Sequence, residues 1–445
     1  MDDPINCPME IASITAHQVY DSRGNPTLEA TVKLRNGVEG TAIVPSGASV
    51  GKYEALELRD GAPQRFLGRS VQKAIQHVNE EIHNALCGRN VCEQENLDQA
   101  LIELDGTKNK RRLGANAILG TSMALARAAA NTSGVPLHVY LGDGAGDLLP
   151  LPEIQIFGGG AHSAGRIDVQ DFMIICVGAQ SYAECLEMTF NVYHRAGELM
   201  KRRGRLAGVA DEGGYWPVFD SNEQAFEFMM EAIGMAGYRP GHDIAISLDI
   251  AASELFRDGS YHLGLESRSF SPEQFAELLV AWCERYPIVS MEDPFAEDDF
   301  AAWAAFTKQM GGKIQIIGDD LFTTNLERIQ YGTQKQLANA VLIKLNQIGT
   351  VTETLQCIRA TQKAQWNPVV SARSGETEDT FIAHLAVATN AGQLKVGSFA
   401  RSERMAKWNE LLRIERQLGS KARFLGGEIL KRSSSRGELP LERPL

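Results

Sequence analysis

The feature that most constrains this chain is a rhythm that begins near Leu149 and continues for about 290 residues. Short apolar runs that end in polar residues alternate with amphipathic segments such as EQFAELLVAWCERY and VTETLQCIRATQKAQ. The apolar runs are IAISLD, PIVSMED, IQIIGDD, AVLIKLN, NPVVSAR and QLKVGS. Repeated strand–helix units of this kind predict a parallel sheet closed into a barrel. An open doubly wound sheet is the alternative, although no G-x-G-x-x-G lies between a strand and a helix.

The first part of the chain has a different pattern. Its opening residues alternate like strands, as in LEATVKL and GTAIVPS, with the turn sequences SRGNP and RNG. A helical pattern follows from Val71, and the Ala-rich stretch NAILGTSMALARAAANTSG ends at Gly134. A length of 445 residues exceeds what one hydrophobic core usually supports. We therefore expect an α+β domain at residues 1–140, a barrel domain at 141–430 and a flexible polar tail at 431–445.

Composition argues against several classes of protein. The formal net charge of −12 does not suit nucleic acid or an anionic membrane as the main partner. No apolar run approaches the ~20 residues that span a bilayer, and the acidic start MDDPINCPME is unlike a secretory signal. Seven scattered cysteines without a CxxC pair fit a reducing compartment. We therefore expect a cytoplasmic protein with no nucleic-acid or membrane partner.

Charged residues occur at the ends of the predicted barrel strands. They are Asp249, Glu292 and Asp319 at three strand ends, and Lys344 and Lys395 within two later strands. The carboxyl ends of barrel strands meet on one face, where such enzymes keep their active sites. Three carboxylates from consecutive strands form a hard oxygen site suited to Mg²⁺. Each acid alone could instead cap a helix after its strand, but the five residues together favour a site.

This combination suits the removal of a proton from the carbon beside a carboxylate. Such a proton is very weakly acidic, because its removal gives a dianionic enolate. Metal ions on the carboxylate oxygens stabilise that charge where it develops. A lysine near the metal has a lowered pKa and can act as a neutral base.

The segment PSGASVGKYEALELRDG, residues 45–61, nearly matches a nucleotide-binding P-loop. The match fails twice, because Ser46 replaces the first glycine and Tyr53 follows Lys52 in place of serine or threonine. We interpret the segment as a mobile lid loop over the site, with Ser49 as a candidate metal ligand. A plain surface loop is the alternative.

Long blocks of the chain resemble the enolase family, phosphopyruvate hydratase. Between about residues 10 and 428 they are DSRGNPT, PSGAS, NKRRLGANAILG, ADEGG, SMEDPFAEDD, GDDLFTTN, IKLNQIGT, RSGETEDT and LLRIE. The resemblance implies an N-terminal α+β cap followed by a modified parallel α/β (TIM-like) barrel. It also implies that 2-phosphoglycerate loses water to give phosphoenolpyruvate, with one tightly bound Mg²⁺ and a second that binds with the substrate.

The resemblance also implies roles for single residues. Asp249, Glu292 and Asp319 match the ligands of the first Mg²⁺, and Ser49 matches a lid ligand of the second. The catalytic matches are Lys344 as base, Lys395 as the group that binds the substrate carboxylate, and Glu212 as the acid that assists departure of the hydroxyl. Phosphate contacts match Arg373 and Ser374, and pocket residues match His162 and Gln170. Glu29 and Arg413 match a pair across a homodimer interface, and a higher oligomer stays open.

Four positions depart from the family pattern. Ala372 replaces a histidine, Asp171 a glutamate, Gly158 an asparagine and Val50 a threonine. Asp171 and Ala372 fall on the side of the site that handles the leaving hydroxyl, whereas the metal ligands and both lysines are intact.

Three functions therefore stay open. The first is ordinary enolase activity, to which Asp171 would contribute as a shortened catalytic acid. The second is a diverged paralogue that uses the same enolisation on a phosphorylated or phosphonate carboxylic acid for another product. Carboxyphosphonoenolpyruvate synthase of phosphonate natural-product biosynthesis is such a case by resemblance. The third is a non-catalytic binding homologue, which the five charged residues disfavour, because unpaired buried charge is costly.

Overall fold

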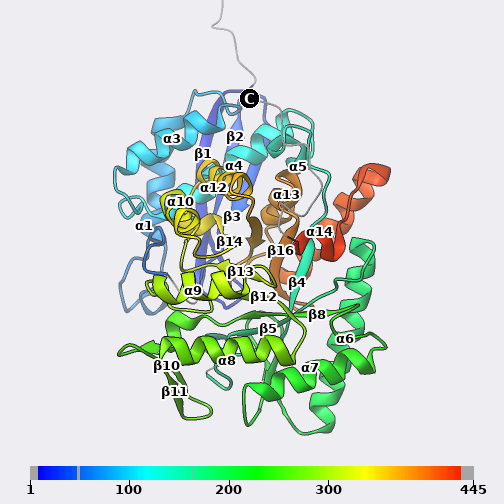
Figure 1. The fold of residues 1–445 in the computed structure, drawn as a ribbon. Coiled ribbons are helices and arrows are strands. Elements are labelled where there is room, and N and C mark those ends of the chain that lie inside the picture. The colour runs from blue at the N-terminus through cyan, green and yellow to red at the C-terminus, as the bar shows by residue number, and fades with distance from the viewer. Residues whose placement is uncertain (1–8, 48–50, 164, 432–445) are drawn as a thin grey trace, which may run out of the picture.

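The computed structural model describes residues 9–47, 51–163 and 165–431. Figure 1 shows two parts: a small sheet with its helices, coloured blue to cyan, and a larger barrel with its helices, coloured green to red. Ser49, Val50 and the predicted tail from residue 432 onward lie outside the described residues. Within the described ranges, no helix is both long and apolar enough to cross a membrane.

The N-terminal part is built on a three-stranded antiparallel sheet of β1 (Ile11–Tyr20), β2 (Pro26–Leu34) and β3 (Glu39–Ile43). Every second side chain of β2 from Leu28 to Leu34 is fully buried, as expected for a sheet with one face against a core. Helix α4 (Ala115–Thr132) covers this face. A Cβ added at Gly40 would lie 2.2 Å from the backbone N of Ala128, so glycine permits this close approach of strand and helix. The remaining helical elements of this part are η1 (Phe66–Gly68), α1 (Gln72–His77), η2 (Val78–Ile82), α2 (His83–Leu86), α3 (Gln94–Asp105) and α5 (Leu137–Leu141).

The C-terminal part is a closed eight-stranded barrel, in which the pairing of the last strand with the first completes the ring. In order around the ring, the strands are β4 (Leu151–Gly158), β5 (Asp171–Ile175), β8 (Ala245–Asp249), β12 (Ile288–Glu292), β13 (Gln315–Gly318), β14 (Ala340–Ile343), β15 (Asn367–Ser371) and β16 (Gln393–Ser398). The predicted cap and barrel are thus confirmed. The predicted domain boundary at residues 140/141 falls within α5, before its last residue, and β4 begins at Leu151.

The barrel is not entirely parallel, because β5 runs antiparallel to both β4 and β8. The connection from β4 to β5 contains only the single-turn helix η3 (Gly160–Ser163), and a parallel return normally needs a longer crossover with a helix. As a consequence, the first residue of β5, Asp171, lies beside the last residue of β8, Asp249. The reversed strand therefore adds an acid to the same end of the barrel.

Helices surround the barrel and smaller sheets lie at its edge. The hairpin of β6 (Leu206–Val209) and β7 (Tyr215–Pro217) extends beside β4, and β9 (Phe256–Arg257), β10 (Ser260–Leu263) and β11 (Arg268–Phe270) form a separate sheet. The helical elements are α6 (Tyr182–Arg202), α7 (Glu223–Met235), η4 (Ala252–Leu255), α8 (Pro272–Arg285), α9 (Phe300–Met310), α10 (Leu326–Lys335), α11 (Leu345–Ile348), α12 (Val351–Lys363), α13 (Phe381–Ala388), α14 (Ser402–Leu418), η5 (Gly419–Lys421) and η6 (Gly426–Leu430).

The barrel interior is partly polar. A small apolar cluster of Ile317, Ala340, Leu342 and Val369 is separate from the large core between strands and helices. Near the amino ends of the strands, Gln315 Nε2 donates hydrogen bonds to Ser290 and Gln393. The apolar runs of the sequence thus supply the outer wall and one side of the interior, and the polar residues at the strand ends line the opening.

Candidate active site

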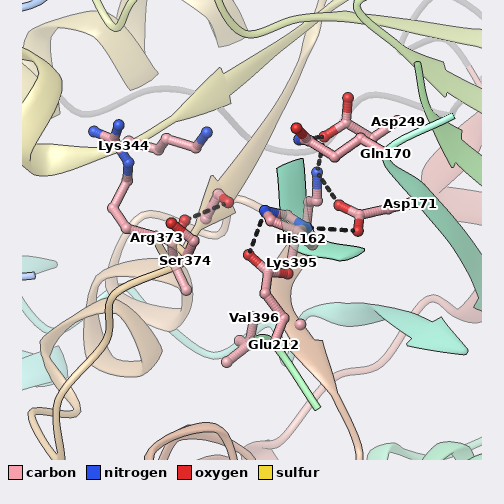
Figure 2. A pocket seen from close by; sticks show the side chains of 13 residues that line it. His162, Gln170, Asp171, Glu212, Asp249, Lys344, Arg373, Ser374, Lys395 and Val396 are labelled. Carbon is pink, nitrogen blue, oxygen red and sulfur yellow. Dashed lines mark hydrogen bonds and ion pairs between the residues drawn. The ribbon is translucent and has the colours of Figure 1, made fainter. Parts of the chain in front are cut away.

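The five charged residues predicted at the strand ends lie together at the carboxyl end of the barrel. Four of them, Asp249, Glu292, Asp319 and Lys395, are buried, and Lys344 is half-buried. Neighbouring strands place them in register, since Asp249 of β8 pairs with Glu292 of β12. A pocket opens here, and Figure 2 shows Lys344 and Arg373 on one side of it and His162, Asp171 and Lys395 on the other.

Both lysines are bound to the predicted metal ligands. Lys395 Nζ donates to Asp249 Oδ2 at 2.8 Å and to Glu292 Oε2 at 2.7 Å. Lys344 Nζ donates to Asp319 Oδ2 at 2.5 Å. Burial disfavours the ammonium forms, but these carboxylates outweigh it and raise the pKa of both lysines. In this arrangement the lysines are charged and act as counterions of the acids.

The carboxylates still outnumber the lysines. Burial and the charge of Asp249 raise the pKa of the Glu292 carboxyl well above its ordinary value, and Glu292 Oε1 has no hydrogen-bond partner among the described residues. Burial and the charge of Asp319 raise the pKa of Asp320 to about 8. Burial and the charge of Asp320 also raise the pKa of Asp293. Surplus buried negative charge on hard oxygen atoms fits a divalent cation such as Mg²⁺.

The closest groupings of potential ligand atoms differ from the predicted trio. Among the described residues, ligand atoms lie within 4.8 Å of one another in two groups, His162 with Asp171 and Glu212, and Asp293 with Asp319 and Asp320. Asp249, Glu292 and Asp319 do not form such a group, because Lys395 lies between two of them and Lys344 binds the third. Their role as metal ligands stays a prediction.

The opposite side of the pocket carries a histidine between two acids. His162 Nδ1 lies 3.2 Å from Asp171 Oδ1, and His162 Nε2 lies 3.7 Å from Glu212 Oε1. Burial disfavours the imidazolium, but Glu212 and Asp171 outweigh it and raise the pKa of His162 to about 9. Burial likewise opposes ionisation of Asp171, but His162 and Lys395 hold its pKa well below the ordinary range. His162 therefore carries the proton that this pair shares near neutral pH.

The remaining predicted pocket residues also reach this space. Gln170 Nε2 donates to Asp249 Oδ2 at 3.1 Å. Arg373 and Ser374, the predicted phosphate contacts, line the pocket beside Lys344. The predicted interface pair lies elsewhere: Glu29 of β2 contacts His17, and Arg413 of α14 contacts Glu410.

Comparisons with known proteins agree with this geometry. The sequence profile described as "Enolase, N-terminal domain" matches residues 11–141, and "Enolase, C-terminal TIM barrel domain" matches residues 147–433. Enolase 1 of Desulfitobacterium hafniense (strain Y51) is 53% identical over 418 residues, which cover 93% of this chain and 95% of that protein. The chain belongs to the enolase family. It is an enzyme of the lyase class.

Several residues that contact the candidate site residues were not predicted from the sequence. Glu54 forms a buried ion pair with Arg373, and Gln347 donates to Asp319 Oδ1 at 2.8 Å. Gln155 donates to Asp171 and accepts the backbone N–H of Gly214. Glu54 and Gln347 lie within blocks that the sequence analysis had singled out, PSGASVGKYEALELRDG and IKLNQIGT, but block membership does not say which side chain points inward.

The positions that depart from the family pattern have local explanations in part. A Cβ at Gly158 would lie 2.6 Å from the Ala210 Cβ, so this backbone leaves no room for a larger residue. Asp171 is shorter than glutamate, and Gln155 holds it from the side of β4. Ala372 is buried and lines the pocket with a methyl group in place of an imidazole. Val50 lies outside the described residues.

Proposed function

We propose that this enolase-family lyase removes the α-proton of 2-phosphoglycerate and eliminates water to give phosphoenolpyruvate, with Mg²⁺ as cofactor. The observation that carries the proposal is the division of one pocket into two chemical halves. Lys344 lies on one side with its partner Asp319, and a protonated histidine between two acids lies on the other, where Lys395 Nζ is 3.6 Å from Asp171 Oδ2. Elimination of water beside a carboxylate needs a base and an acid placed on opposite sides of the substrate in this way.

The first half of the reaction belongs to the lysines. Asp249, Glu292 and Asp319 would hold one Mg²⁺ and Ser49 a ligand position of a second, and the ions would neutralise the negative charge that develops on the substrate carboxylate. Lys344 takes the α-proton once Asp319 no longer stabilises its ammonium form. Lys395 binds the substrate carboxylate. Lys344 is paired with Asp319, and Lys395 is paired with Asp249 and Glu292, so each lysine would be released when a cation takes over its carboxylate partners.

The second half belongs to the acids across the pocket. Glu212 assists departure of the hydroxyl, and His162 supplies a positively charged neighbour for it. Asp171 stays ionised and fixes His162 through its Nδ1. Arg373 and Ser374 bind the phosphate, and Gln170 orients Asp249. The substrate is thus held at its carboxylate and phosphate while the hydroxyl faces the acids.

A second candidate is favoured by Ala372. This residue lines the pocket but has no proton to give and no hydrogen-bonding side chain. A diverged enzyme could form the same enolate and pass it to another electrophile, as in carboxyphosphonoenolpyruvate synthase, with a phosphorylated or phosphonate carboxylic acid as substrate.

We also propose a cytoplasmic homodimer in which Glu29 and Arg413 meet across the interface.

The test is the absorbance of the phosphoenolpyruvate double bond after 2-phosphoglycerate and Mg²⁺ are added. A turnover of ~10 s⁻¹ or more, an ordinary enzymatic rate, supports the first function. Deuterium exchange at the α-carbon without phosphoenolpyruvate supports the second. The absence of both would contradict both functions and leave a binding role.

A further inference from the structure

Arg373 is held by a carboxylate from the N-terminal part of the chain. Its Nη1 and Nη2 donate to the two oxygens of Glu54, at 2.9 and 3.2 Å. The two side chains are each only 4% exposed. Nη1 also donates to Asn346 Oδ1 at 2.8 Å. A two-pronged contact of this kind fixes the plane of the guanidinium as well as its position.

Glu54 is itself fixed by its surroundings. Its Oε1 accepts the backbone N–H of Gly51 at 3.0 Å and lies 3.5 Å from Gln347 Nε2. The same Nε2 of Gln347 donates to Asp319 Oδ1. The backbone oxygen of Gln347 accepts the N–H of Ala55. One glutamine side chain therefore links the Glu54–Arg373 pair to a predicted metal ligand.

These contacts have a cost that a purely structural pair could avoid. Two ions removed from water each lose favourable hydration, and an apolar pair of equal volume is often as stable. The position of the pair suggests a use for it, since Arg373 lines the pocket opposite His162. An arginine already held in one plane loses less conformational entropy when an anion binds.

We propose that Glu54 is a positioning residue, which holds Arg373 in the orientation that receives the substrate phosphate. Gln347 couples this pair to Asp319, so that the phosphate-binding and metal-binding sides of the pocket are aligned by one connected set of contacts. The inference rests on the proposed function in one respect, the assignment of the phosphate to Arg373.

The experiment compares Glu54→Gln with the wild type in the presence of Mg²⁺. The variant keeps the shape of the side chain but removes its charge. We expect the KM for 2-phosphoglycerate to rise about tenfold or more with a smaller change in kcat, and the Kd of inorganic phosphate, measured by calorimetry, to rise in parallel. Tighter phosphate binding by the variant would show that Glu54 competes with phosphate, and would overturn the proposal.

A matched control is available on the surface. Glu231 of α7 accepts two hydrogen bonds from Arg203, at 2.8 and 2.7 Å, in a partly exposed pair outside the pocket. Glu231→Gln makes the same chemical change and should leave the KM and the phosphate Kd within a factor of two. An equal effect of both variants would overturn a specific role for Glu54.

A double-mutant cycle separates positioning from general stability. If Glu54 acts through Arg373, then Glu54→Gln should change phosphate binding less than twofold in an Arg373→Gln background. Additive effects would overturn the proposal. Should Glu54→Gln fail to fold by circular dichroism, Glu54→Asp keeps the charge and shortens the reach. It should then give a smaller rise in Kd that also disappears with Arg373→Gln.

Phosphate binding keeps this test independent of turnover. A wild type that does not turn over 2-phosphoglycerate contradicts the first proposed function, while phosphate binding still compares the variants. If Arg373→Gln leaves the phosphate Kd of the wild type unchanged, the inference is overturned whatever the turnover.

Discussion

The two sides of the pocket are built in different ways. On the enolate-forming side, a division by proposed role and not by position in the pocket, Asp249 and Glu292 are the last residues of β8 and β12, and Lys395 lies within β16. On the leaving-group side, His162 comes from the connection after β4, and Glu212 comes from the turn between β6 and β7. The first side is thus fixed by the register of the barrel, and the second is carried mostly by loops.

The departures from the family pattern do not follow this division. Gly158 is the last residue of β4, Asp171 is the first residue of β5, and Ala372 directly follows β15. Asp171 and Ala372 line the pocket, and the resemblance assigns both to the handling of the leaving hydroxyl. The comparison predicts that proton abstraction is robust and that elimination is the step open to change.

The largest expected effect concerns the base. Lys344→Ala should lower α-proton exchange of 2-phosphoglycerate with solvent deuterium by about 10⁴-fold, the upper range for loss of a positioned base. Proton NMR of the α-carbon measures the exchange. Retained exchange would move the base elsewhere, with Lys395 the next candidate, and would break the assignment of this side.

Metal binding should give the next largest effect. Mg²⁺ at about 100 times its Kd should stabilise the wild type by about 2.7 kcal/mol, because the ion binds the folded state only. Thermal melts in EDTA and in millimolar Mg²⁺ measure the shift. Asp249→Ala, Glu292→Ala or Asp319→Ala should each remove it. An identical melting temperature with and without Mg²⁺ in the wild type would contradict the site.

The charge surplus on the enolate-forming side extends below the pocket to Glu153. This buried residue of β4 pairs in register with Lys395 and accepts a hydrogen bond from Ser247 at 2.9 Å, and its other oxygen has no partner in the part of the chain that the structure describes. Burial raises the pKa of its carboxyl from 4.5 to about 6. A difference of about 1.5 pH units corresponds to about 2 kcal/mol.

The raised pKa of Glu153 makes the folded state less stable as the pH rises. Because the folded state holds the proton more tightly, the contribution of Glu153 to stability is full below about pH 4.5 and is lost as the pH rises through 6. Glu153→Gln should therefore stabilise the protein by about 2 kcal/mol at pH 7.5, and by less at pH 5. Urea unfolding in EDTA measures both. Equal stability of variant and wild type at pH 7.5 would refute the prediction.

The smallest effect tests the leaving-group side. The double variant Asp171→Glu with Ala372→His should raise the rate of elimination about tenfold relative to α-proton exchange. Each single change should do less, because the two groups share one hydrogen-bond network and do not act additively. Absorbance of phosphoenolpyruvate and NMR exchange give the two rates. A wild type that already eliminates as fast as it exchanges would remove the contrast between the two sides.

Much of this protein could be predicted from local sequence pattern. Alternation in β2, the Ala-rich helix ending before Gly134, and apolar runs closed by acids indicate cap and barrel, because each pattern reflects one buried face repeated along the chain. The runs IAISLD, PIVSME and AVLIKLN also placed Asp249, Glu292 and Lys344 at the same end of a barrel. Periodicity alone suffices here, since parallel strands present their ends together.

Other features depended on the tertiary structure. The antiparallel course of β5, which brings Asp171 beside Asp249, depends on the length and content of one connection. The pairing of Glu54 with Arg373 joins residues more than 300 positions apart, and no local pattern records it. The contacts of Lys344 and Lys395 with the predicted metal ligands balance charge in a buried space. Contacts of this kind are decided by which side chains meet after folding, so they become visible only in three dimensions.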